Sequence, residues 1–201
     1  MKKIVIFNGS PRMDGNTATI LQMIERGAKE HNAEVKSYTL FKMRAMACQG
    51  CFACRVGEGT MVEDKYDVAK KDWCCLIDDE LSKALKEVKD ADAIVIGSPV
   101  YFMQVSGMVK NLYDRFFPLI GLDGTPRYGQ KKIVTVYSQD NEDPNMFSMY
   151  FDYLAAVFPG FGFVDEKRII CVKANDPEAA ENNRGLKTHA YSVGQSLAMG
   201  E

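Results

Sequence analysis

Five of the six cysteines lie between residues 48 and 75 of this 201-residue chain. Cys48, Cys51 and Cys54 follow one another at two-residue spacing, and Cys74 and Cys75 lie further along. Thiols this close in sequence do not pair easily with one another, but three of them can bind one inorganic centre if a fourth thiolate joins. The pattern indicates metal-binding or redox chemistry. It leaves open a [4Fe–4S] cluster, zinc, and thiols or disulfides without metal.

A second candidate site is the polar stretch 9–17, which follows a short apolar run and precedes an amphipathic segment. A phosphate at such a place meets backbone N–H groups and the positive end of a helix dipole. A glycine lets the backbone come close to the phosphate, and side-chain donors strengthen its binding. The groups offered here are the hydroxyls of Ser10 and Thr17, the amide of Asn16, the guanidinium of Arg12 and the backbone at Gly15.

The elements that must position these residues follow from the hydrophobic pattern. Short β-branched runs bounded by turn residues predict strands, and apolar residues at three- and four-residue spacing predict the helices between them. The expected strands are 3–7, 33–40, 91–96, 132–137 and 162–172. The first expected helix carries Ile20, Leu21, Ile24 and Ala28, with Asn16 or Thr17 as its N-cap. The other expected helices are 79–89, 107–117, 146–158 and 177–197.

Strands that alternate with helices predict an α/β protein with a parallel sheet covered on both faces. A dinucleotide-binding Rossmann fold would carry G-x-G-x-x-G after the first strand, but this sequence has GSPRMDG there. The predicted fold is therefore flavodoxin-like, a three-layer α/β/α sandwich with a five-stranded parallel sheet in the order 2-1-3-4-5. We expect residues 1–201 to form one domain with a cysteine-rich insertion at about 41–77.

Two motifs together resemble a known family. GSPRMDGNT after the first strand and GSPVYF at 97–102 after the third are similar to the NAD(P)H-dependent FMN reductases and iron-sulfur flavoproteins. The first and third strands flank the switch point of such a sheet, where ligands bind beyond the carboxyl ends. The resemblance covers residues 1 to about 137, and it is more specific for FMN than for a substrate.

The resemblance implies an oxidoreductase that transfers hydride from NAD(P)H to bound FMN and electrons on to a small acceptor such as a quinone. Because the flavin carries this chemistry, no catalytic side chain is expected. The first motif would hold the phosphate, the second would wrap the ring, and a polar contact is expected after the fourth strand. The expected FMN-binding residues are Ser10, Arg12, Gly15, Asn16, Thr17, Pro99, Val100, Tyr101, Phe102, Ser138 and Asp140. A homodimer or homotetramer is also implied.

The same resemblance bears on the cysteines. Its cluster motif places a fourth ligand shortly before an Asp-Asp helix start, a place that Cys74 occupies here, with Cys75 as the alternative. The gap after Cys54 is longer than that motif has. One alternative function is thus an iron-sulfur flavoprotein, with Cys48, Cys51, Cys54 and Cys74 or Cys75 as ligands and a ferredoxin-like partner. Another is a redox-sensing flavodoxin-like module without enzyme activity.

Composition and charge narrow the partners. The formal net charge is −2 and no basic run is present, which argues against nucleic acid and acidic membrane surfaces. No apolar stretch reaches the roughly 20 residues of a membrane span, and no cleavage site follows the first residues, so a cytoplasmic protein is expected. His31 and His189 have no neighbours at ligand spacing and are given no role, and Cys171 is expected in the core.

Overall fold

The structure is a computed structural model that describes residues 1–55 and 75–201. Its strands are β1 (Lys3–Asn8), β2 (Glu34–Thr39), β3 (Ala93–Tyr101), β4 (Gln104–Val105), β5 (Lys131–Ser138) and β6 (Phe163–Cys171). Its α-helices are α1 (Asn16–Glu30), α2 (Glu80–Val88), α3 (Gly107–Asp114), α4 (Ser148–Val157) and α5 (Arg184–Met199). None of these helices combines the length and the hydrophobicity that crossing a bilayer requires.

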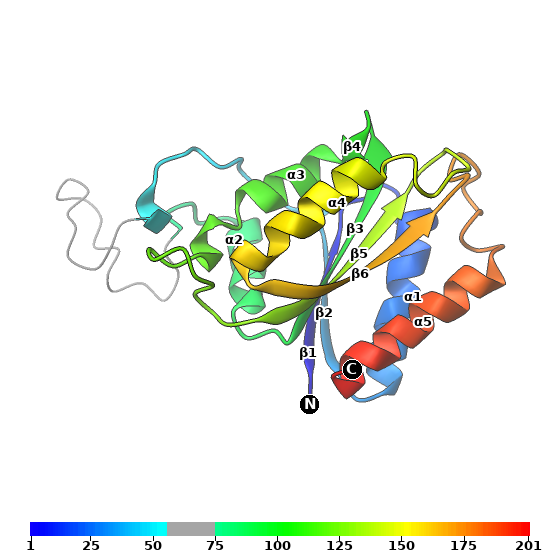
Figure 1. The fold of residues 1–201 in the computed structure, drawn as a ribbon, viewed down its shortest axis with the longest axis horizontal. Helices are drawn as coiled ribbons and strands as arrows, with labels where there is room; N and C mark the ends of the chain where they lie inside the picture. The colour runs from blue at the N-terminus through cyan, green and yellow to red at the C-terminus, as the bar shows by residue number, and fades with distance from the viewer. Residues whose placement is uncertain (56–74) are drawn as a thin grey trace.

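The strands form one sheet in the order β2-β1-β3-β5-β6, and all neighbours in this path are parallel (Figure 1). The short β4 pairs antiparallel with the end of β3. Because β4 is the return of a hairpin and not a crossover strand, the five parallel strands keep the order 2-1-3-4-5. The prediction of a flavodoxin-like fold is confirmed.

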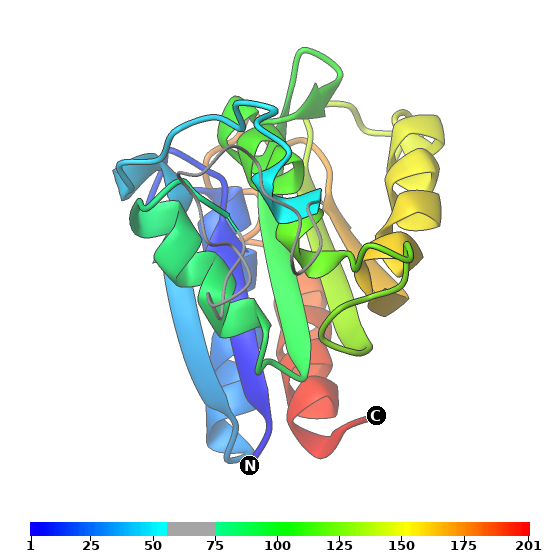
Figure 2. The ribbon, with the colours of Figure 1, turned by 90° about the vertical axis from the view of Figure 1, so that its left-hand side faces the viewer.

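Helices cover both faces of the sheet, as Figures 1 and 2 show from two sides. On one face α2, α3 and α4 pack over residues such as Phe7, Ile94 and Ile96. On the other face α1 and α5 pack over Ile6 and Val95. The central strands are therefore buried on both faces, which explains their continuous apolar sequences.

The two helices α1 and α5 approach each other backbone to backbone. A Cβ atom added at Gly194 of α5 would lie 2.0 Å from the carbonyl oxygen of Ile24 in α1, and one added at Gly27 would lie 2.1 Å from that of Tyr191. These two glycines thus permit a closer contact than any larger side chain would allow.

Several predicted boundaries differ from the structure, among them the end of the helix expected over 107–117, which stops at Asp114, and two larger differences. The third strand was expected to end at residue 96, but β3 continues to Tyr101. The last helix was expected from residue 177, but α5 begins at Arg184, because the Asn183 side chain caps it and accepts the Leu186 N–H at 2.9 Å. The Asp176 carboxylate accepts the Glu178 N–H at 2.9 Å, so the preceding residues form turns.

Candidate functional site

A polar cavity of about 210 Å³ lies at the carboxyl ends of β1, β3 and β5. This is the edge of the sheet where open α/β folds bind ligands. Ten of the eleven residues expected to bind FMN line it, all except Phe102. Ala174 and Asn175, which the sequence did not single out, complete it. The lining residues are Ser10, Arg12, Gly15, Asn16, Thr17, Pro99, Val100, Tyr101, Ser138, Asp140, Ala174 and Asn175.

The first turn of α1 forms one end of the cavity. Its N-cap is Gly15, and no side chain caps the turn. The N–H groups that begin a helix have no acceptor inside it, so an uncapped start leaves them for a ligand. The Arg12 side chain is exposed beside them, and the Ser10 hydroxyl accepts the Arg12 N–H at 3.2 Å, which fixes the turn of the loop. This end of the cavity is suited to an anion.

The hydroxyls of Thr17 and Ser138 join two walls of the cavity. Their oxygens lie 2.7 Å apart, and either can donate to the other. Both residues are more than nine-tenths buried. This contact ties the start of α1 to the end of β5 directly under the cavity.

Asn16 lines the cavity, but its side-chain amide bonds the protein backbone. Its Nδ2 donates to the carbonyl oxygens of Ala174 at 3.2 Å and Asp176 at 2.7 Å, and its Oδ1 accepts the Ala180 N–H at 2.7 Å. Both side-chain donors are therefore used within the protein. The partners lie about 160 residues further along the chain, so no local pattern could have revealed them.

Residues 99–102 were predicted to form a loop after the third strand. In the structure they form the end of β3 and the first half of a hairpin turn. Val100 pairs with Val105 and Tyr101 with Gln104. The pairing of β3 with β1 ends at Gly97, so Pro99 has a parallel neighbour only on the side of β5. A proline is tolerated there because no strand within the described residues lies on its other side to accept the backbone N–H that proline lacks.

Phe102, which was expected to bind the flavin, does not line the cavity. It forms the tip of the hairpin with Met103, both at positive φ (46° and 69°), and it is 99% exposed. The turn therefore places its ring outside the lining of the cavity. Tyr101, which is 46% exposed, is the aromatic residue that does line the cavity.

The helix α3 begins beside this cavity. Its N-cap Ser106 donates its hydroxyl to the carbonyl oxygen of Gly9 at 2.7 Å, and its N–H donates to the Ser98 hydroxyl at 2.8 Å. At its other end Asp114 and the next residue, Arg115, line a second cavity. Eight residues at 1.5 Å each make α3 about 12 Å long. The helix α3 therefore begins next to the first cavity and ends at the second.

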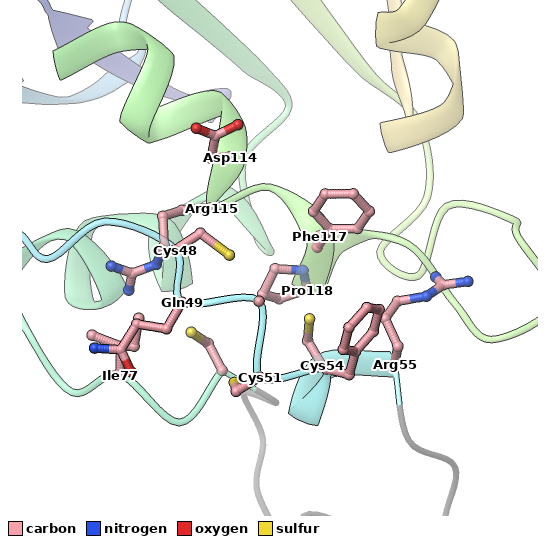
Figure 3. A pocket seen from close by; sticks show the side chains of 13 residues that line it. Cys48, Gln49, Cys51, Cys54, Arg55, Ile77, Asp114, Arg115, Phe117 and Pro118 are labelled. Atoms are coloured by element: carbon pink, nitrogen blue, oxygen red, sulfur yellow. The ribbon is translucent and has the colours of Figure 1, made fainter. Parts of the chain in front are cut away.

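This second cavity, of about 270 Å³, brings the cysteines together. Cys48, Cys51, Cys54 and Cys75 all line it, and Figure 3 shows the first three with Arg115 and Pro118 around the same space. Cys74, the other candidate for the fourth ligand, lies outside the described residues. Within 1–55 and 75–201, no three His, Cys, Asp or Glu side chains are arranged to hold a metal ion.

An ion pair that the sequence did not predict holds both ends of the cysteine segment. Arg115 donates to Asp79 at 3.0 Å and 3.2 Å, and the two side chains are only 1% and 8% exposed. Asp79 accepts the Met46 N–H at 2.9 Å, and Arg115 donates to the Met46 carbonyl oxygen at 2.8 Å. The pair therefore fixes the chain two residues before Cys48 against the helix that follows Cys75.

Burial acts against both charges of this pair. It disfavours the charged guanidinium, but hydrogen bonds and charge interactions with Asp79 and Cys75 outweigh it, so the pKa of Arg115 is raised. Burial alone would raise the pKa of Asp79, yet hydrogen bonds from Arg115, Met46 and Ser82 lower it below its usual value. Both groups are charged at neutral pH.

Comparison with known proteins places the chain in a family. Residues 2–142 match the family of NADPH-dependent FMN reductases. The chain belongs to this family. The matched part includes the first motif, the hairpin, the cysteine segment and β5, and it ends before β6.

Several relatives are similar over part of the chain. An iron-sulfur flavoprotein of Methanocaldococcus jannaschii is 33% identical over 117 residues, 58% of this chain and 53% of that protein. An iron-sulfur flavoprotein of Archaeoglobus fulgidus is 35% identical over 113 residues, 56% of this chain and 48% of that protein. The chain thus spans about half the length of the curated relatives it matches.

Solved structures share the fold at low identity. An FMN-dependent NADH-azoreductase of Bacillus anthracis, in complex with FMN, has a TM-score of 0.70 at 14% identity, over 98% of this chain and 100% of that one. An NAD(P)H:quinone oxidoreductase of Methanothermobacter marburgensis has a TM-score of 0.69 at 14% identity, over 98% of both chains. At these identities the likeness concerns the fold alone.

Proposed function

We propose that the protein is an FMN-dependent oxidoreductase that uses NADH or NADPH and reduces a small acceptor such as a quinone or free flavin. The observation that carries this proposal is the polar cavity at the switch point, where an uncapped helix start and Arg12 face the same space. Membership of the FMN reductase family supports it. Bound FMN would accept hydride from the nicotinamide and pass electrons to the acceptor.

The residues of the chain would bind and orient the flavin. The first-turn N–H groups of α1 and the Arg12 guanidinium would bind the phosphate, a terminal dianion that suits one helix start. The backbone of Pro99 and Val100 would bond the polar edge of the ring, and Tyr101 would pack against it. Ser138 and Asp140 would close the side at β5.

The binding part of this proposal is tested by replacing Arg12 with alanine. A hydrogen bond to a charged group contributes about 1.5–3 kcal/mol, so the Kd for FMN should rise roughly 10- to 100-fold, whereas the Kd for riboflavin, which lacks the phosphate, should not change. Arg44→Ala is the matched control, because this exposed arginine lies outside the cavity. An unchanged FMN Kd in the Arg12→Ala/Thr17→Ala double variant would contradict the assignment.

The redox part is tested by anaerobic rapid mixing of the FMN-loaded protein with NADH or NADPH. We expect the flavin absorbance to bleach on a catalytic timescale with one of the two. Reduction by dithionite but by neither nicotinamide would rule out the reductase and favour an electron-transfer role.

A second candidate function is that of an iron-sulfur flavoprotein that exchanges electrons with a ferredoxin-like protein. Four cysteines from the first and last parts of the insertion at 41–77 line one cavity, and α3 runs from that cavity toward the proposed flavin site. A [4Fe–4S] cluster is larger than one ion and would accept thiolates spread around its core. We propose Cys48, Cys51, Cys54 and Cys75 as its ligands; it would supply one-electron transfer.

Iron and acid-labile sulfide in anaerobically prepared protein test this second candidate. Cys51→Ser and Cys75→Ser should lose iron, whereas Cys171→Ser is the control because that buried thiol lies in β6, away from the cavity. Retention of iron in Cys75→Ser would refute Cys75 as the fourth ligand. An iron-free wild type would exclude the cluster and leave the flavin reductase.

A further inference from the structure

One wall of the proposed flavin cavity is formed by residues beyond 2–142, the part of the chain that matches the family. The segment between β6 and α5 contributes Ala174 and Asn175 to the lining, whereas the family match ends at residue 142. On the side of β5 this segment is held by the backbone of Gln139, which donates its N–H to Cys171 at 2.8 Å and accepts the Ala174 N–H at 2.9 Å. We call residues 174–180 the outer wall.

On the side of α1 the outer wall is held by one side chain. Asn16 is 6% exposed, and its amide bonds three backbone groups of the wall: the carbonyls of Ala174 and Asp176 and the N–H of Ala180. Both of its N–H donors point to these carbonyls. A further bond from this amide to a ligand phosphate would need one of the two donors to be shared or released.

We propose that Asn16 is a positioning residue, which fixes the outer wall and thereby holds Asn175 against the phosphate end of the bound flavin. It does not itself bind the phosphate. The identity of the ligand rests on the proposed function, but the link between Asn16 and the wall does not. Asn175 lines the cavity next to Ala174, whose carbonyl oxygen accepts from Asn16 in the first turn of α1, so its amide is the wall's donor to the phosphate or to the adjoining hydroxylated chain of FMN.

Hydrogen exchange in the flavin-free protein tests the link directly. In the wild type the Ala180 N–H is bonded to Asn16 Oδ1 and should be protected. In Asn16→Ala we expect its exchange, and that of peptides covering the wall, to become at least tenfold faster. Thr17→Val is the matched control, because the Thr17 side chain faces Ser138 and not the wall. Unchanged exchange in Asn16→Ala would overturn the proposal.

Flavin binding tests the positioning role. Asn16→Ala and Asn175→Ala should each raise the Kd for FMN about tenfold, and the double variant should be no worse than the worse of the two, because both remove the same wall contact. Additive losses, combined with unchanged exchange in the wall, would make Asn16 a direct phosphate donor and overturn the proposal. Faster exchange with an unchanged Kd would also overturn it.

The variant Asn16→Asp separates the two roles further. It keeps an acceptor for Ala180 but loses both donors, and it adds a negative charge. If Asn16 holds the wall, the Ala180 N–H should exchange more slowly in Asn16→Asp than in Asn16→Ala, because the retained side-chain oxygen still accepts that N–H; equal exchange in the two variants would overturn the proposal. A wild type that binds no FMN would refute the proposed function, and the exchange experiment would still decide whether Asn16 holds the wall.

Discussion

Replacing Arg115 with methionine should destabilise the protein strongly, because it leaves the Asp79 carboxylate buried without its counter-charge. The two side chains are 1% and 8% exposed, and Arg115 donates to Asp79, to the Ser82 hydroxyl at 2.6 Å and to the Met46 carbonyl oxygen at 2.8 Å. Methionine fills most of the same volume, so the loss comes from the broken ion pair and its hydrogen bonds, and not from a cavity.

The expected size follows from burial. Exposed ion pairs contribute about 0–1 kcal/mol, but removing one partner of a buried pair costs about 3–5 kcal/mol. For a chain of this length such a loss corresponds to a Tm lower by roughly 10 °C. Arg44→Met removes the same charge from an exposed position and should change the free energy of unfolding by less than about 0.5 kcal/mol.

The pH dependence has a definite sign. The pKa of Asp79 is lowered in the folded protein, so its contribution is present above the ordinary pKa of an aspartate and is lost as the pH falls through the folded value. In Arg115→Met the pKa of Asp79 is affected only by its burial and by the backbone N–H groups of Met46 and Ser82. The difference between wild type and variant should therefore be largest near pH 7 and shrink below about pH 4.

Urea unfolding at pH 7 and pH 4 measures the difference in the free energy of unfolding between wild type and Arg115→Met. A double variant provides the decisive comparison. Arg115→Met/Asp79→Asn keeps an oxygen to accept the Ser82 N–H but removes the unpaired charge, so it should be more stable than Arg115→Met alone. A loss below 1 kcal/mol in the single variant, or a double variant no more stable than the single, would show that the Arg115–Asp79 pair does not stabilise the fold through its buried charges.

Two further predictions concern packing and thiol chemistry. Gly194→Ala should lower the free energy of unfolding in urea by about 1–3 kcal/mol, because its Cβ would lie 2.0 Å from the Ile24 carbonyl oxygen, whereas Gly107→Ala, with nothing within 4 Å, should be neutral or stabilising. Burial raises the pKa of the Cys171 thiol to about 11, so at pH 8 iodoacetamide should modify exposed Cys48 well before Cys171, as mass spectrometry of the native protein would show. Reaction of Cys171 at the rate of Cys48 would contradict its burial.

Much of the fold and most of the cavity lining were predictable from the sequence. Apolar runs predicted the central strands, alternation predicted the second strand, and the absence of G-x-G-x-x-G after the first strand argued against the Rossmann alternative. The motifs after the first and third strands met at one edge because carboxyl ends of parallel strands share that edge. These features depend on local spacing and on general rules of chain topology, and both can be read from one sequence.

Other parts of the site were decided only by tertiary contacts. The Asn16 amide bonds residues about 160 positions away, and Arg115 reaches back 36 residues to Asp79 and 69 to Met46. Phe102 does not line the cavity, because it and Met103, both at positive φ, form the tip of the hairpin. A side chain's donors and charges take whichever partners the folded chain brings near, and local spacing does not specify those partners. The sequence therefore determined which polar groups were available at the site, and packing determined which of them bind within the protein and which face the cavity.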